Sequence, residues 1–241
     1  MQPSVQLVLA TFERHGVQAI LMGGQACVYY GASEVTRDVD VAILSDASNL
    51  AALSTAMREL QAQVIAVPPF MKELLDAGHA VHFRCAAPAV SGLRVDIMSR
   101  MRGVDPFPVL WERRTLLANG VGVLSLPDLV LAKKTQRDKD WPMVRRLIEA
   151  DYFAPRSSVG DAAPSFWLRE CRTPSLLQNL VAHHPIEASR ETRPVVQLAV
   201  QGATAEAISQ ALRDEEDAER AIDAAYWRPL KKQLEALRHS R

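Results

Sequence analysis

One short segment constrains this chain more than any other: an apolar run that ends in two glycines, followed by two aspartates that alternate with valines. The run covers residues 17–22, Gly23 and Gly24 follow it, and Asp38 and Asp40 come after a further gap. Successive side chains of a strand point to opposite faces, so the two aspartates share one face while the valines face the core. The segment therefore predicts a buried strand with two carboxylates on its polar face, preceded by a glycine turn.

Two carboxylates side by side resist joint ionisation unless a cation lies between them. The cations that suit an all-oxygen pair are Mg²⁺ and Mn²⁺, which usually also bind the phosphates of a substrate. A Gly-Gly turn at the start of a helix exposes backbone N–H groups that suit a phosphate. We therefore expect Asp38 and Asp40 to bind the metal and Gly23 and Gly24 to bind phosphate. Arg37, directly before the first aspartate, is placed with the nucleotide-binding residues.

A third acid, Asp96, interrupts the short apolar strand at residues 93–98. If that strand lies beside the one with Asp38 and Asp40, the three carboxylates form one cluster. The ordered set of glycine turn, paired aspartates and single aspartate resembles the nucleotidyltransferase superfamily of the polymerase-β type, over residues 15–150. The resemblance implies an α+β fold with a mixed β-sheet flanked by helices, and catalytic, metal-binding roles for the three aspartates. The family usually has Gly-Ser or Gly-Gly in the turn, so Gly24 fits but supplies no hydroxyl.

A basic segment follows Ser125 and is expected to continue the helix that starts at Leu126. It resembles the helix after the catalytic sheet in bacterial nucleotidyltransferases of the abortive-infection toxin type, in which a lysine contacts the triphosphate. Lys133 and Arg137, or Lys134 and Arg137, would share a helical face. We prefer Lys134 as the triphosphate ligand, with Lys133 as the alternative; a solvated charged helix is the other interpretation.

The chain of 241 residues is long enough for one domain with a helical annex, and we expect a catalytic domain at 1–150 and a helical region at 151–241. The segments 79–86 and 92–99 predict a β-hairpin, and the first fifteen residues predict an amphipathic helix rather than a signal peptide. No apolar run approaches the ~20 residues that span a bilayer. Three widely spaced cysteines argue against a disulfide framework, so we expect a cytoplasmic protein with no membrane partner.

The formal net charge is zero, but residues 94–146 contain eleven Lys or Arg against six Asp or Glu, a local charge of +5. A basic field of this kind is expected around a site that handles phosphates. The predicted reaction is transfer of a nucleoside monophosphate from an NTP to an acceptor hydroxyl, with release of pyrophosphate. The resemblance suggests tRNA or another RNA as acceptor and an antitoxin protein as partner. The alternatives are a small-molecule or protein acceptor, a catalytically silent nucleotide-binding or antitoxin-like module, and a structural interaction protein.

Overall fold

The computed structural model describes residues 2–33, 36 and 38–239, and these residues form two compact units. The first unit draws its described residues from 2–29, 33–132 and 226–239, and the second unit from 30–32 and 133–225. The domain boundary expected at residue 150 falls inside the second unit, and the last turns of the chain belong to the first. The division into domains 1–150 and 151–241 stays a prediction.

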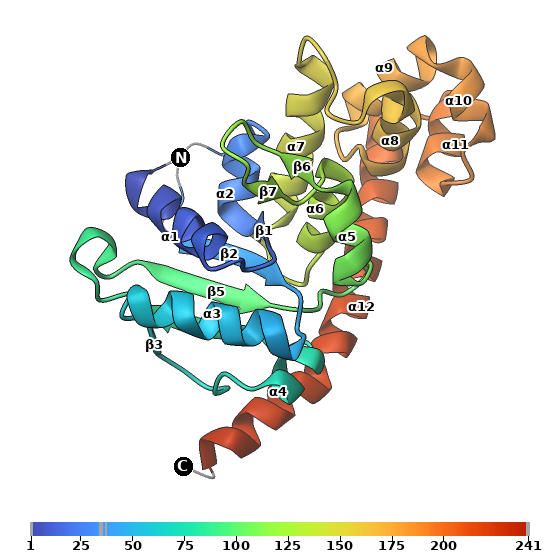
Figure 1. Cartoon of the computed structure of the whole chain (residues 1–241). Coiled ribbons are helices and arrows are strands. Elements are labelled where there is room, and N and C mark those ends of the chain that lie inside the picture. Colours follow the sequence, from blue (N-terminus) through green and yellow to red (C-terminus); the bar gives the residue numbers. More distant parts are fainter. Residues whose placement is uncertain (1, 34–35, 37, 240–241) are drawn as a thin grey trace. The chain divides into compact units, whose positions relative to one another are not determined.

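The first unit is built on a mixed sheet, in which seven strands of the described residues lie in the order β3-β4-β5-β2-β1-β7-β6 (Figure 1). The pairs β2–β5 and β1–β7 are parallel, and the other four pairs are antiparallel. The expected hairpin at residues 79–86 and 92–99 is confirmed as the pair β4–β5. The strands are β1 (Ala19–Met22), β2 (Asp38–Ile43), β3 (Gln63–Val64), β4 (Val81–Arg84), β5 (Arg94–Met98), β6 (Thr115–Leu116) and β7 (Gly122–Val123).

Helices pack on this sheet and close its apolar core. The first helix is amphipathic as expected, because Val5, Val8 and Phe12 at helical spacing are at most 2% exposed. It lies against α3, and α2 packs on β1 and β2. The helices that begin in this unit are α1 (Pro3–Arg14), α2 (Gly23–Tyr29), α3 (Ala47–Glu59), α4 (Lys72–Asp76), α5 (Phe107–Arg113) and α6 (Leu126–Lys133), with a 3₁₀ turn at Pro88–Val90.

The second unit is helical in its described residues. Several of its helices begin with proline in the first turn, where the missing N–H costs no hydrogen bond. Its elements are α7 (Trp141–Phe153), a 3₁₀ turn (Gly160–Ala162), α8 (Ala163–Glu170), α9 (Pro174–His183), α10 (Pro185–Arg190), α11 (Pro194–Val200) and the first part of α12 (Ala205–His239). The expected class, an α+β protein with a mixed sheet flanked by helices and a helical C-terminal region, is confirmed. In the part of the chain that the structure describes, no helix combines the length and apolarity needed to cross a membrane.

Asn49 on α3 ties this helix to the ends of β1 and β2, and it provides a test of the fold. Its side chain, in a residue only 4% exposed, donates to the carbonyls of Gln18 (3.0 Å) and Leu44 (2.7 Å) and accepts from the Gln18 N–H (2.7 Å). Asn49→Ala leaves these partners unpaired and should lower the free energy of unfolding by about 1–3 kcal/mol. Ser48→Ala, which removes an exposed hydrogen bond to Asp46, should change it by less than about 0.5 kcal/mol in the same urea titration. Equal losses in the two variants would contradict the role given to Asn49.

Candidate active site

The parallel pairing of β2 with β5 brings the three predicted aspartates to one face of the sheet. In this register Asp40 is the direct partner of Asp96, and Asp38 is the direct partner of Arg94. Asp38 and Asp40 are half-buried, whereas Val39 between them is completely buried. The expectation that the strand with Asp96 lies beside the strand with the paired aspartates is confirmed. We call Asp38, Asp40 and Asp96 the acidic face.

The glycine turn is packed against the acidic face. Met22, the last residue of β1, pairs with Asp40, so Gly23 follows directly beside that carboxylate. Gly23 has a φ of +62°, and a Cβ added to it would lie 1.9 Å from Asp40 Oδ2. The Gly24 N–H donates to the same oxygen at 3.4 Å. No side chain fits at Gly23, both because of its backbone conformation and because of the carboxylate beside it.

Gly24 is equally crowded, on its other side. A Cβ added to it would lie 2.5 Å from the Thr36 hydroxyl oxygen, and the Gln25 side chain donates to the Thr36 carbonyl at 3.3 Å. The turn thus packs closely on the segment that enters β2. Arg37, predicted to contact nucleotide, lies outside the described residues.

Asp96 has two basic partners that the sequence patterns did not reveal. Arg94 Nε donates to Asp96 Oδ1 at 2.7 Å, and His82 Nδ1 lies 2.9 Å from the same oxygen. A third contact, 3.0 Å from Arg94 Nη2 to His82 Nδ1, closes the triangle. Two signals could have found them: Arg94 is two residues before Asp96 on one strand, and the register of the predicted hairpin pairs His82 with Asp96.

These contacts decide the protonation of the site. Burial raises the pKa of Asp96, but the hydrogen bonds from His82 and Arg94 and their charges lower it more, so the pKa lies below its ordinary value. The hydrogen bond to Asp96 raises the pKa of Arg94, against the effect of burial, and the charges of Asp96, Asp38 and Asp40 add to the rise. Arg94 thus interacts electrostatically with all three acids, and Asp96 is ionised at neutral pH.

The oxygen donors of the acidic face fit Mg²⁺ or Mn²⁺ by their chemistry. Among the described residues, however, no three His, Cys, Asp or Glu side chains are arranged to hold one metal ion. At Asp96, Oδ1 already meets Arg94 and His82. A metal ion bound by all three acids would therefore use Asp96 Oδ2, or would share or replace these contacts at Oδ1.

The predicted triphosphate residues belong to the second unit, and each has a carboxylate partner there. Lys134 Nζ lies 2.7 Å from Glu170 Oε2, Lys133 Nζ lies 3.3 Å from Asp140 Oδ1, and Arg137 Nη2 lies 2.7 Å from Asp140 Oδ2. The expected helical face is wrong, since α6 ends at Lys133. Residues 134–140 form a loop, because the Thr135 hydroxyl accepts from the Arg137 N–H in place of a helical bond.

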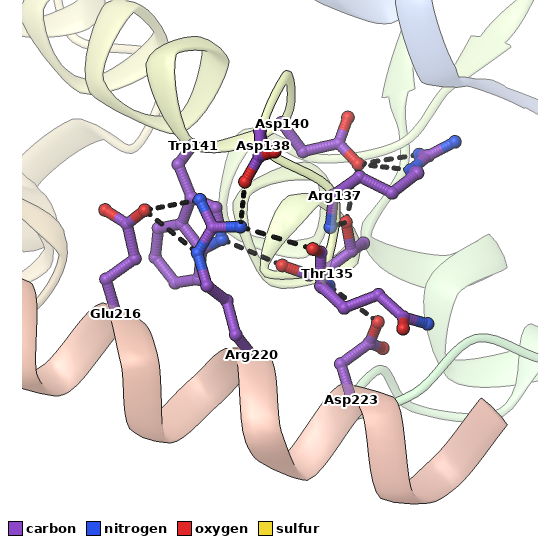
Figure 2. Close-up of polar contacts among 9 residues, drawn as sticks. Thr135, Arg137, Asp138, Asp140, Trp141, Glu216, Arg220 and Asp223 are labelled. Carbon is purple, nitrogen blue, oxygen red and sulfur yellow. Dashed lines mark hydrogen bonds and ion pairs between the residues drawn. The ribbon is translucent and has the colours of Figure 1, made fainter. Parts of the chain in front are cut away.

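This loop, residues 134–140, is tied to α12 at both its backbone and its side chains (Figure 2). Asp223 accepts from the Gln136 N–H at 2.8 Å, while Arg220 donates to the Gln136 carbonyl at 3.2 Å and to Asp138 at 2.7 Å. Inside the loop the buried Asp140 accepts from Thr135 at 2.6 Å and from Arg137. Asp140 occupies the N-cap position of α7, but its side chain makes no capping hydrogen bond and pairs with Lys133 and Arg137 instead.

Comparison with known proteins adds little to this geometry. No family model matches the chain, and neither does any curated protein. Among solved structures, a protein from H. pylori that is provisionally assigned as a nucleotidyltransferase is similar over 92% of this chain and 94% of its own. The identity is 10% and the TM-score is 0.43. A likeness at this level carries no argument, so the case for a function rests on the residues themselves.

The close approach of Gly23 to Asp40 can be separated from backbone strain by a matched pair of variants. Gly23 and Gly16 have φ of +62° and +68°, but a Cβ added at Gly16 meets nothing within 4 Å. Gly16→Ala should therefore cost only the left-handed strain, about 1–2 kcal/mol. Gly23→Ala should destabilise more, because its Cβ displaces the Asp40 carboxylate. Thermal unfolding of both variants measures the difference, and equal losses of Tm would show that Asp40 does not crowd the turn.

Asp140 predicts a dependence of stability on pH. Burial raises its pKa, but the charge of Lys133, the hydrogen bond from Thr135 and the charge of Arg137 lower it more, so the folded pKa lies below the unfolded value of about 3.9. A carboxylate with a lowered pKa stabilises the fold fully above the unfolded pKa, and this contribution is lost as pH falls through the folded pKa. The stability difference between wild type and Asp140→Asn should therefore be large at pH 6 and shrink below about pH 4.

Urea titrations across this pH range measure that difference. Asp138→Asn is the control in the same loop, because the Asp138 side chain is fully exposed and its pair with Arg220 should contribute little. A difference between wild type and Asp140→Asn that is constant with pH would contradict the assignment.

Proposed function

We propose that this protein is a nucleotidyltransferase that moves a nucleoside monophosphate from an NTP to a hydroxyl of an acceptor. The observation that carries the proposal is the direct pairing of Asp40 with Asp96, with Asp38 on the same face and the glycine turn pressed against Asp40. Three carboxylates from two adjacent strands beside a backbone turn are the donor set that metal-assisted phosphoryl transfer needs.

In this reaction the acceptor oxygen forms a bond to the α-phosphorus while the bond to the bridging oxygen breaks, and pyrophosphate leaves. Asp38 and Asp40 would hold Mg²⁺ or Mn²⁺, which when bound supplies charge neutralisation to the phosphate oxygens. Asp96 would complete this site or take the proton of the attacking hydroxyl. Arg94 and His82 already meet Oδ1, so Asp96 would act through its second oxygen, or through Oδ1 after Arg94 moves.

The remaining roles follow from the family resemblance. Gly23, Gly24 and Arg37 would bind the nucleotide, and Lys134, or Lys133 in its place, would bind the departing pyrophosphate together with Arg137. As acceptor we propose RNA, with tRNA as the first to test, and we propose a cytoplasmic protein with an antitoxin partner. A small molecule or a protein is the alternative acceptor.

A second function, a silent nucleotide-binding module, is favoured by one observation. Arg94 and His82 already hold Asp96 through Oδ1, so this carboxylate is engaged within the protein. A silent module would bind NTP without releasing pyrophosphate. Incubation with each labelled NTP, Mg²⁺ and total RNA distinguishes the two functions, because only the enzyme transfers label to an acceptor.

Replacement of Asp40 tests the enzyme. Asp40→Asn should lower the transfer rate about hundredfold or more, since a metal ligand contributes several kcal/mol to the transition state. It should also reduce the rise in Tm that Mg²⁺ and a non-hydrolysable NTP produce in the wild type, because a ligand stabilises only the form that binds it. Near-wild-type transfer in this variant, with Asp138→Asn as control, would refute the assignment.

A test of Lys134 as triphosphate ligand has to separate nucleotide binding from the ion pair that Lys134 forms with Glu170. Both side chains of the Lys134–Glu170 pair are at most 12% exposed, so Lys134→Ala alone leaves a buried carboxylate unpaired and should destabilise the fold. The double variant Lys134→Ala/Glu170→Gln removes both charges and isolates the role in binding. If Lys134 contacts the triphosphate, this variant should bind NTP at least about tenfold more weakly, with NMP affinity unchanged. Equal losses of affinity for NTP and NMP would exclude triphosphate binding by Lys134. If the double variant retains its NTP affinity and Lys133→Ala loses it, Lys133 is the triphosphate ligand.

A further inference from the structure

The last turns of α12, residues 226–239, belong to the first unit and lie beside α4 (Figure 1). One face of this segment packs on the turn between α4 and β4. Gln233 Oε1 lies 2.7 Å from Nε2 of the buried His79, and Leu230 is 7% exposed. The Tyr226 hydroxyl approaches Gly78 so closely that a Cβ added there would lie 2.4 Å from it. This inner face anchors the segment to the unit that carries the acidic face.

The other face of the same segment is basic. Arg228, Lys231, Lys232 and Arg238 are all exposed, and their separations of three, four and seven residues place them on one side of a helix. The single acid of the segment is Glu235, so residues 226–239 carry a net charge of +3 with histidine neutral. We call these four cations the basic stripe.

Three of these cations have no acidic partner among the described residues. The structure gives Arg228, Lys232 and Arg238 no ion pair there, whereas Arg220 on the same helix pairs with both Glu216 and Asp138. A helix dipole favours cations only in its last turn, which explains Arg238 but not Arg228 or Lys232. Contacts within the described part of the chain therefore do not account for the charge of Arg228 and Lys232.

The stripe and the acidic face are connected through one strand. His79, which the inner face of α12 contacts, lies two residues before the start of β4, and His82 on β4 contacts Asp96. Both features thus belong to the same unit, and the acids themselves cannot bind a phosphodiester backbone without a cation. Glu235 lies on the same face, four residues after Lys231 and three before Arg238, and offsets part of this charge. The net positive charge that remains is complementary to a line of phosphates.

We propose that the basic stripe binds the phosphate backbone of an RNA, positioning it for the proposed nucleotidyl transfer. The positioning role rests on the proposed function, whereas binding of RNA to the stripe can be measured without it. Each phosphate contacted on a single strand contributes about −0.7 to the log–log slope of affinity against salt. Three unpaired cations predict a contribution of about −2 to that slope.

The test measures binding of a fluorescent RNA hairpin with a single-stranded 3′ end, by anisotropy at several salt concentrations and without NTP. The stripe variant is Arg228→Gln/Lys232→Gln/Arg238→Gln. The control variant, Arg145→Gln/Arg146→Gln/Arg156→Gln, removes the same charge from exposed positions of the second unit. The stripe variant should bind about tenfold or more weakly near 0.1 M salt and have a slope shallower by about 2. The control should retain most of the affinity.

Equal losses in the two variants would overturn the proposal, because net charge alone would then explain binding. So would a wild-type affinity that does not change with salt. Vesicles of anionic phospholipid bound more tightly than RNA at equal salt, through the same three residues, would overturn the assignment to RNA. The proposed function fails separately: intact, stripe-dependent RNA binding without label transfer from any NTP would refute the enzyme and leave the surface standing.

Discussion

The parallel pairing of β2 with β5 is the interaction on which the rest of the candidate site depends. Side chains alternate along both strands, so this register buries Val39 and Val95 completely while it sets Asp40 beside Asp96. A slip by one residue would turn the valines outward and the acids into the core. Burial of each valine contributes about 1.5–3 kcal/mol, so the same apolar packing that stabilises the sheet also holds the acids together.

Like charges held this closely need compensation, and within the described residues Arg94 supplies much of it. Its guanidinium donates to Asp96 and lies within electrostatic range of the other two acids. The repulsion among the three carboxylates is therefore partly compensated by Arg94 even without a metal ion. A divalent ion bound here would meet a carboxylate that Arg94 already holds through Oδ1, so in the proposed mechanism the guanidinium would either orient this metal ligand or move when the ion binds.

The distribution of basic charge shows why counting along the chain is a poor guide to a surface. Residues 94–146 carry a local charge of +5 in sequence, yet Arg94, Lys133 and Lys134 each meet a carboxylate in the fold. Their charge is largely used in holding the protein together. Within the described residues, Arg228, Lys232 and Arg238 at the end of α12 have no ion pair, and they share a helical face with Lys231 and a single acid, Glu235.

The sequence by itself determined the local features: the glycine turn, the alternation of acids and valines in β2, the hairpin of β4 and β5, and the helical second half. These follow from backbone sterics and from the period of apolar residues, which neighbours along the chain set. Only the tertiary structure decided which partners the polar groups meet. Glu170 on Lys134 and the end of α6 at Lys133 depend on contacts between residues far apart in sequence or on competing side-chain hydrogen bonds. Periodicity reports which face a residue occupies, and a hairpin fixes the register of its own two strands, as for His82 and Asp96. An ion pair between segments far apart in sequence depends on how the second segment approaches, which no local pattern encodes.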